Sequence, residues 1–438
     1  MKKLILTSAI VVFVLLSFSE SLTSQTLAWR KYTGISNFSN IYDSFDDLYF
    51  LNAYTGWVNY HGGKIYKTTN SGINWNLVFQ DTSFYFSRKL TFYNEQIGYS
   101  GLTNGICKTT NGGLNWTKFT IPGMSNLTSV GISTIDANTV YVCGNSANVP
   151  KFAKSTDGGN TWAVTDMSTH MLGVYDIKFF NANTGFAVGY KFGSFLTNSK
   201  GIVLYTSTGG ASWESRYVTT AVNVNAYQIN FNYDNSIGTI VIEGQVTPSV
   251  FLKTTNMGVT FAELTFSNTA YVSQAACFKN ANTGWVGGSR GANAPLFFTN
   301  NGGNTFDTVS WGRCLTAMIF INDTLGFACG YNIYKYSYGT DVGIHNTGET
   351  ALSYALYQNY PNPFNPNTTI KFSLAKQGDV RISVFDIMGK EIRTLVSGIL
   401  QSGTYTVDLN ADELTSGVYF YKLETDNFNE TKKMLLIK

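Results

Sequence analysis

The sequence predicts an all-β protein: a seven-bladed β-propeller followed by a small C-terminal β-sandwich of the immunoglobulin-like kind. Three observations support this fold class. One eight-residue pattern that ends in an aromatic residue occurs six times between residues 68 and 306. The aromatic residues follow one another at intervals of 41, 46, 51, 48 and 45 residues, about the length of one four-stranded blade. Beyond about residue 341, short alternating segments replace this repeat.

Each copy of the pattern indicates a tight turn between two strands. The clearest copy is Ser155–Trp162, and the fifth residue is glycine in all six copies, which allows the positive φ that a tight hairpin needs. The third residue is short and polar, and its side chain can bond the backbone two residues further on. The final aromatic begins the next strand and can bury its ring between sheets. The residues assigned to these turns are Asn70, Gly72, Trp75, Asn111, Gly113, Trp116, Asp157, Gly159, Trp162, Gly210, Trp213, Gly258, Phe261, Asn301, Gly303 and Phe306.

A second phrase, glycine followed by a strand, precedes the turns. Examples are Gly56-Trp57 and Gly326-Phe327, and Val140-Tyr141 is a variant without the glycine. Seven such phrases against six turns leave one blade without its outer strand. The segment Ala28–Tyr32 is similar to the segments that follow the turns, so we expect it to complete the last blade beside Ile333–Tyr336. This closure removes free sheet edges.

The turn pattern resembles the Asp-box of sialidase-type propellers, S/T-x-D-x-G-x-T-W, which Ser155–Trp162 matches in full. Together with the glycine phrase, it is similar to the propellers of photosystem II assembly factors and, more distantly, to those of xyloglucanases and sortilin-type receptors. The Asp-box resemblance implies a structural turn remote from any ligand site. The alternative is that Asp157 is a catalytic carboxylate, but turn chemistry alone explains every position.

Residues 1–24 are typical of an export signal. Lys2 and Lys3 precede an apolar run over residues 4–18, which is shorter than the ~20 residues of a membrane-spanning helix. Small residues suited to cleavage follow at Ser19, Ser21 and Ser24. An uncleaved anchor is the alternative. We expect cleavage, a propeller over residues 26–340 and no membrane span in the mature chain.

Residues 341–355 indicate a polar linker, and residues 356–438 a separate domain. Three prolines between residues 361 and 366 exclude a helix there. The segment Asp386–Lys390 is typical of a hairpin turn. The alternating pattern predicts strands at Thr369–Leu374, Val380–Asp386, Ile392–Leu395, Thr404–Leu409, Val418–Leu423 and Lys432–Ile437.

This domain resembles, nearly end to end, the C-terminal sorting domain of the bacterial type IX secretion system. The motifs that carry the resemblance are Tyr360–Pro366, Val384–Gly389, Ser416–Leu423 and Lys432–Lys438, with Gly417, Tyr419, Lys432 and Lys433 as the sorting-motif residues. The resemblance implies a Gram-negative, Bacteroidetes-like bacterium, the type IX machinery as partner, and a secreted or outer-membrane-surface location. An accessory sandwich without a transport role is the alternative.

Composition excludes some partners and cofactors. Lys plus Arg number 30 against 27 Asp plus Glu, only 13% of the chain is charged, and no basic run occurs, which argues against nucleic acid. The five cysteines form no C-x-x-C pair, and we expect buried thiols, although Cys277 and Cys314 belong to neighbouring blades and could pair. With three histidines, a His-rich metal site is implausible, and we expect no metal or other cofactor.

The sequence contains no catalytic cluster that stands out. The propeller has too few arginines for a sialidase or for the arginine-lined face of photosystem II assembly factors. The neighbours Asp46 and Asp47 point to opposite faces of a strand and cannot flank one sugar bond. Long loops gather on one face of blades three to six, where binding residues tend to lie. The candidate ligand-binding residues in or beside them are His170, Tyr190, Phe192, Phe195, Tyr227 and Arg290.

These rings can stack on sugars or pack against a protein partner, and the alternative is that they only pack their own loops. We therefore expect noncatalytic binding of glycan or protein at the cell surface or outside the cell. Two other functions stay open: an extracellular glycoside hydrolase or lyase acting on polysaccharide, and a structural adhesion or matrix module.

Overall fold

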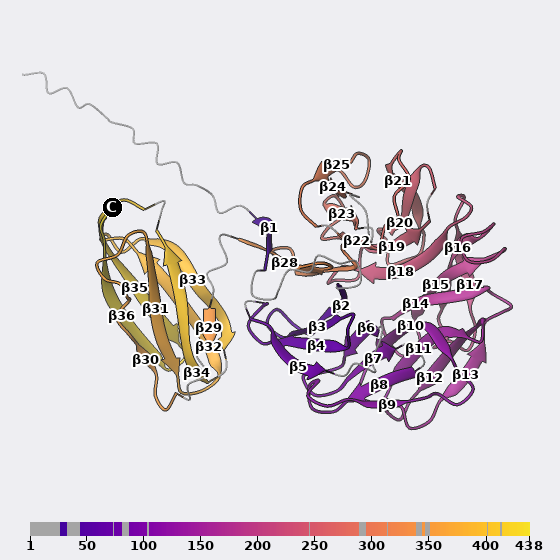
Figure 1. The fold of residues 1–438 in the computed structure, drawn as a ribbon, viewed down its shortest axis with the longest axis horizontal. Coiled ribbons are helices and arrows are strands. Elements are labelled where there is room, and N and C mark those ends of the chain that lie inside the picture. The colour runs from indigo at the N-terminus through magenta and orange to yellow at the C-terminus, as the bar shows by residue number, and fades with distance from the viewer. Residues whose placement is uncertain are drawn as a thin grey trace, which may run out of the picture.

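The computed structural model describes residues 27–32, 44–72, 74–80, 87–102, 105–244, 246–288, 295–312, 314–338, 344–346, 351–400, 402–411 and 414–438. These residues form strands, turns and bends, and among them there is no helix long and apolar enough to cross a membrane. The predicted export signal lies outside them. Figure 1 shows the two predicted bodies, a propeller from indigo to orange and a yellow sandwich.

The described part of the propeller forms seven antiparallel four-stranded blades. The first strands of successive blades contact one another and β26 contacts β2, so these strands surround the axis. Blade one consists of β2 (Phe45–Phe50), β3 (Gly56–Tyr60), β4 (Lys64–Thr68) and β5 (Asn76–Gln80). Blade two consists of β6 (Ser87–Phe92), β7 (Gly98–Leu102), β8 (Gly105–Thr109) and β9 (Thr117–Phe119). Blade three consists of β10 (Leu127–Thr134), β11 (Val140–Ser146), β12 (Val149–Ser155) and β13 (Ala163–Asp166). Blade four consists of β14 (Gly173–Phe179), β15 (Gly185–Lys191), β16 (Lys200–Thr206) and β17 (Glu214–Val218), and blade five of β18 (Asn225–Phe231), β19 (Gly238–Glu243), β20 (Ser249–Thr254) and β21 (Ala262–Ser267). Blade six consists of β22 (Ala275–Phe278), β23 (Gly284–Gly287), β24 (Leu296–Thr299) and β25 (Asp307–Val309). Blade seven consists of β26 (Ala317–Asn322), β27 (Leu325–Cys329), β28 (Ile333–Tyr338) and β1 (Leu27–Lys31).

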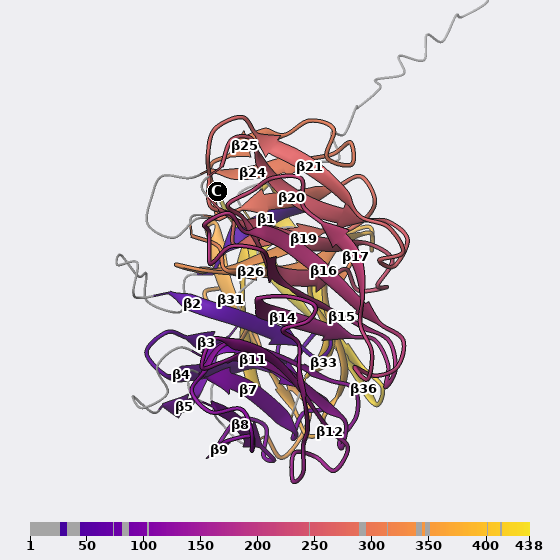
Figure 2. The same cartoon turned by 90° about the vertical axis from the view of Figure 1, so that its right-hand side faces the viewer.

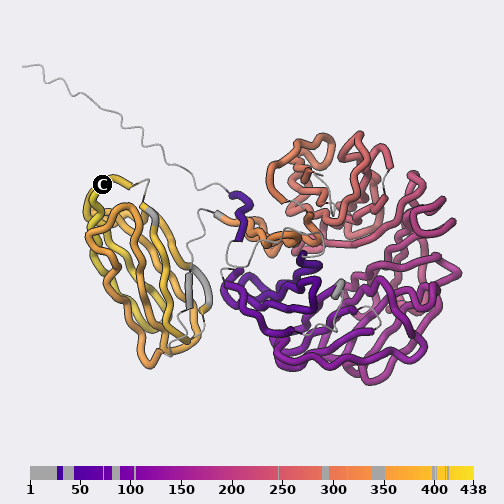
Figure 3. Tube along the Cα trace, viewed as in Figure 1, coloured from indigo at the N-terminus to yellow at the C-terminus, as the bar shows by residue number. Residues whose placement is uncertain are grey.

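The N-terminal strand closes the ring as predicted. Strand β1 pairs with β28, with Trp29 opposite Tyr336. The Trp29 ring also packs against Trp311, Trp285 and Phe320, at centroid distances of 4.9, 5.7 and 5.6 Å. In Figures 1 and 2 the indigo β1 lies beside the orange last blade, and the tube of Figure 3 shows the same path. The prediction of a closed ring is confirmed.

The recurring glycine is explained by the aromatic ring opposite it. A Cβ on Gly98 would lie 2.4 Å from the ring of Phe92, its partner in the neighbouring strand, so no larger residue fits without a shift. Blade three lacks the glycine because Val140 faces Thr134 and no ring stands there. The same pairing of glycine and phenylalanine occurs at Gly56 and Phe50, Gly185 and Phe179, Gly238 and Phe231, Gly284 and Phe278, and Gly326 and Phe320.

These phenylalanines also join one blade to the next. The Trp57 ring of blade one stacks on Phe92 of blade two at 3.6 Å between centroids. Phe327 of blade seven stacks on Phe50 of blade one at 3.7 Å, across the closure. Stacked rings therefore join blade one to both of its neighbours, including the last blade across the closure.

The six turns share one hydrogen-bond geometry. In the clearest copy, Ser155 Oγ accepts the N–H of Gly159 at 2.8 Å, and Asp157 Oδ1 accepts the N–H of Thr161 at 2.8 Å. The third-position side chain thus reaches four residues along the chain, and the expected reach of two residues was too short. Hydrogen bonds to Asp157, first from the Thr161 hydroxyl and then from the Thr161 N–H, lower the pKa of this carboxyl to about 2.

The turns also receive bonds from the preceding blade. Tyr99 Oη donates to the Gly158 carbonyl at 3.0 Å, and Lys108 Nζ donates to the same oxygen at 2.7 Å. Trp57 Nε1 donates to the Gly112 carbonyl at 2.9 Å in the same way. This geometry makes the turns contacts between blades.

The C-terminal body consists of two four-stranded sheets around one core. The first holds β29 (Ile344–Asn346), β34 (Gly403–Asn410), β31 (Asn367–Leu374) and β30 (Ala355–Leu356), and the second β33 (Glu391–Leu400), β32 (Gly378–Phe385), β35 (Gly417–Thr425) and β36 (Phe428–Leu436). Two of these strands were not expected: β29 arises within the predicted linker because Ile344 pairs with Val407, and β30 lies just before the proline segment. The five cysteines of the propeller are buried thiols, as expected.

Candidate functional site

The channel along the propeller axis contains charged side chains that the sequence reasoning missed. Alternate residues of each first strand face this channel. At one level they are Asp47, Lys89, Asp176 and Gln228, each following a β-bulge in its strand. The bulge residue before Asp176 is Tyr175, and the one before Gln228 is Tyr227. Bulges of this kind re-aim side chains beside functional sites.

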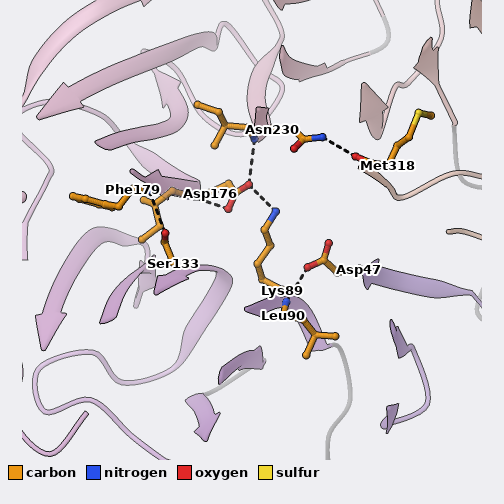
Figure 4. A network of polar contacts seen from close by, with 10 residues as sticks. Asp47, Lys89, Leu90, Ser133, Asp176, Phe179, Asn230 and Met318 are labelled. Carbon is orange, nitrogen blue, oxygen red and sulfur yellow. Dashed lines mark hydrogen bonds and ion pairs between the residues drawn. The ribbon is translucent and has the colours of Figure 1, made fainter. Parts of the chain in front are cut away.

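An ion pair crosses the channel from blade two to blade four. Lys89 Nζ lies 3.0 Å from Asp176 Oδ2, and that oxygen also accepts the N–H of Ile229 at 3.2 Å (Figure 4). Burial lowers the pKa of the Lys89 ammonium, but the carboxylates of Asp176 and Asp47 outweigh burial and hold it above its ordinary value. A Cβ on Gly131 of the intervening blade three would lie 2.8 Å from the Asp176 Cα, so glycine permits this close packing.

Asp47 occupies the other side of Lys89. Its Oδ2 accepts the N–H of Leu90 at 2.8 Å (Figure 4). Burial raises the pKa of Asp47 to about 6, against the lowering effects of Lys89 and of the Leu90 N–H. The neighbouring Asp46 contacts His61 instead, at 3.2 Å, so these two adjacent acids do not share a site.

The channel cavity has a volume of about 130 Å³. Lys178, two residues beyond Asp176, lines it, and among the described residues Lys178 has no ion-pair partner. Burial, and then the nearby Lys89 ammonium, lower the pKa of Lys178. Ser133 and Asn230 line the same cavity, and its wall mixes these polar residues with apolar ones such as Ile132 and Met318.

Three of the predicted ligand-binding rings gather around Tyr175 in blade four. Its ring centroid lies 6.0 Å from Tyr190, 6.1 Å from Phe195 and 5.7 Å from Tyr227. Phe192 lies in the same loop as Phe195, and the two side chains are 53% and 50% exposed. We call these five residues, Tyr175, Tyr190, Phe192, Phe195 and Tyr227, the aromatic cluster.

The other two predicted residues differ. His170 is half-buried in the turn before β14, where its backbone N–H donates to the Met167 carbonyl at 2.8 Å. Arg290 lies outside the described residues. Tyr175 was missed because it stands in a strand and not in a long loop, and only its ring contacts with Tyr190 and Phe195 show that it belongs with the loop residues.

A larger cleft lies beside the cluster, between blades four and five. Its volume is about 780 Å³. One wall is the loop of residues 220–223, and the other consists of residues 246–250 and strand β21. Both loops belong to the set of long loops that the sequence placed on one face.

Residues 358–438 match the family model described as the secretion system C-terminal sorting domain. The sorting-motif residues Gly417 and Tyr419 lie in β35, and Lys432 and Lys433 lie in β36. The domain marks this protein as one exported by the type IX system to the cell surface or the extracellular space.

No curated protein matches the chain. Among solved structures, YCF48 from Cyanidioschyzon merolae is similar with a TM-score of 0.54 and 15% identity, over 71% of this chain and 99% of that one. A streptogramin B lyase has a TM-score of 0.54 and 14% identity, over 72% of this chain and 98% of that one. An ancestral GH74 enzyme has a TM-score of 0.50 and 12% identity, over 93% of this chain and 63% of that one. Identities this low show the propeller fold alone.

Proposed function

We propose that the exported propeller binds a glycan through the aromatic cluster without converting it. The observation that carries the proposal is the half-exposed ring of Phe195, which packs on Tyr175 together with Tyr190 and Tyr227, and a second half-exposed ring, Phe192, in the same loop. Large apolar side chains that stay exposed together mark interaction sites. Aromatic rings offer flat apolar faces for the C–H faces of sugars, and the hydroxyls of Tyr175, Tyr190 and Tyr227 are polar groups suited to sugar hydroxyls.

The backbone of the cluster loop supports the proposal. Phe192, Leu196 and Asn198 have φ values of +67, +55 and +55°, in the left-handed region that non-glycine residues rarely adopt. Such strain concentrates where a binding surface needs a fixed shape. The loop therefore holds Phe192 and Phe195 outward at a conformational cost.

The test is a glycan array probed with the mature protein and with the Phe192→Ala/Phe195→Ala variant. We expect wild-type signal on at least one polysaccharide class and its loss in the variant. Leu114→Ala is the matched control, because Leu114 is 58% exposed in a turn of blade two on the opposite face. A blank array together with a protein captured only by the wild-type cluster would assign the site to a protein partner.

A polysaccharide hydrolase or lyase is the second candidate, and the channel carboxylates favour it. A carboxyl group whose pKa lies near 6, such as Asp47, is suited to acid–base catalysis. Turnover of any polysaccharide that Asp47→Asn or Asp176→Asn abolishes, in protein that retains its β-sheet circular dichroism, would establish this function.

We also infer that residues 1–24 are removed on export and that the C-terminal domain is the part that the type IX machinery contacts. Mass spectrometry of protein from culture medium and cell surface tests this. We expect a mature N-terminus near residue 25, and intact residues 1–24 would contradict the inference.

A further inference from the structure

We infer that the cleft between blades four and five extends the aromatic cluster into one site for an uncharged glycan chain of several sugars. The inference rests on the proposed function, because the cluster supplies the first contact. The cleft volume of about 780 Å³ lies within the ~300–1,000 Å³ that is typical of small-molecule sites, and it exceeds the space that one sugar ring needs.

A single loop, residues 219–224, connects the cluster to the cleft; we call it the bridging loop. On the cluster side, Asn223 Oδ1 accepts the N–H of Asn198 at 2.8 Å, and the Val224 N–H donates to the Ser199 carbonyl at 3.4 Å. On the cleft side, residues 220–223 of the same loop form a wall. The two surfaces are therefore adjacent, and a chain anchored on Phe195 can continue across the bridging loop.

Glu263 of β21 holds the bridging loop in place. Its Oε2 accepts the Thr220 N–H at 2.8 Å and the Tyr217 hydroxyl at 3.2 Å. Its Oε1 accepts the Thr220 hydroxyl at 2.8 Å and the Ala221 N–H at 3.4 Å. Burial, assisted by this carboxylate, raises the pKa of Tyr217 to about 12, so the tyrosine stays a hydrogen-bond donor. A wall fixed in this way reduces the ordering cost of binding.

The lining determines the class of ligand. Among the described lining residues there is no lysine, arginine or histidine, and the one carboxylate, Glu263, is engaged in the bonds above. The exposed hydroxyls of Thr247 and Thr265 have no protein partner in the described structure and are available to sugar hydroxyls. Val222, which is 48% exposed, and Pro248 offer apolar contacts to C–H groups. Hydroxyls and small apolar groups without cations favour a neutral sugar chain over an acidic one.

The test is calorimetric titration of the mature protein with glucose, mannose and N-acetylglucosamine and with their β-1,4-linked trimers and hexamers. We expect at least tenfold tighter binding of the trimer than of the monosaccharide in one of these series. Thr247→Val/Thr265→Val removes both hydroxyls at nearly constant volume, so it should reduce trimer affinity to that of the monosaccharide. Thr117→Val, the same change on an exposed outer strand of blade two, is the control and should have no effect.

The outcomes separate the inference from the proposed function. Equal affinity for monosaccharide and hexamer, or a length dependence that persists in Thr247→Val/Thr265→Val, overturns the inference and leaves the cluster as the site. Absence of binding to any saccharide, or affinity unchanged by Phe192→Ala/Phe195→Ala, overturns the proposed function and the inference with it. Binding of an extended peptide in the cleft, in place of every saccharide, also overturns the inference.

Discussion

Replacement of Gly98 by valine tests the packing rule that repeats around the propeller. A Cβ at this position would lie 2.4 Å from two carbons of the Phe92 ring, whereas nonbonded carbons prefer ~3.5–4.0 Å. The ring or the strand must therefore move by more than ~1 Å. Overpacking of this kind costs ~1–3 kcal/mol of unfolding free energy. The Phe92 ring also stacks on Trp57 at 3.6 Å, so its loss in Phe92→Thr should cost ~3 kcal/mol or more.

Blade three supplies the control, because Val140 already faces Thr134 there. The double variant Gly98→Val/Phe92→Thr reproduces that pair in blade two and removes the overlap. We therefore expect it to be less destabilised than the sum of the two single variants, by ~1–3 kcal/mol.

The assay is urea unfolding followed by tryptophan fluorescence, which reports on the propeller alone because all 8 tryptophans lie before residue 312. Additivity of the two single variants within ~0.5 kcal/mol would refute the argument that ring and glycine select each other.

Three further predictions test the axis and the closure by the same unfolding assay. Lys89→Met should cost ~3–5 kcal/mol because it leaves Asp176 ionised and buried, and Lys89→Met/Asp176→Asn should regain part of that loss; equal stability of the two would contradict the ion pair's role. The pKa of Asp47 is about 6 in the folded protein against an ordinary 3.8, so its ionisation disfavours the fold. Between pH 4 and above pH 6 the wild type should therefore lose up to ~3 kcal/mol relative to Asp47→Asn, and a constant difference across that range would show that Asp47 is not perturbed. Trp29→Ala should cost ~2–3 kcal/mol because four aromatic rings surround a half-buried Trp29, and an unchanged midpoint would mean that β1 contributes little to closure.

Repetition explains how much of the fold the sequence could predict. The turn around Ser155–Trp162 and the phrase at Gly56-Trp57 recur with small changes, so each copy supports the others, and the unmatched Ala28–Tyr32 indicates the closing strand. The sorting domain was recognisable from several motifs at fixed positions. The sequence showed that blade three has Val140 in place of the recurring glycine, but it could not explain why. The explanation depends on the partner residue Thr134, which only the strand register identifies.

The axial residues lacked such a signal. Lys89 and Asp176 come from different blades, 87 residues apart. The equivalent positions carry different residue types, Asp47, Lys89, Asp176 and Gln228, so no repeated pattern marks them. The bulges that aim them depend on backbone register, which a pattern of alternating residues does not specify. The cleft could not be predicted from the sequence for a similar reason. Glu263 and Thr220 meet because of the path of the bridging loop, and no local sequence pattern specifies that path.

Affinity electrophoresis tests the central claim, that the exported propeller binds a glycan through its aromatic cluster. Wild type, Phe192→Ala/Phe195→Ala and Leu114→Ala are run through native gels with and without embedded neutral polysaccharide. We expect retardation of the wild type and of Leu114→Ala, and normal migration of the Phe192→Ala/Phe195→Ala variant. Equal retardation of all three proteins, or of none, would contradict the claim.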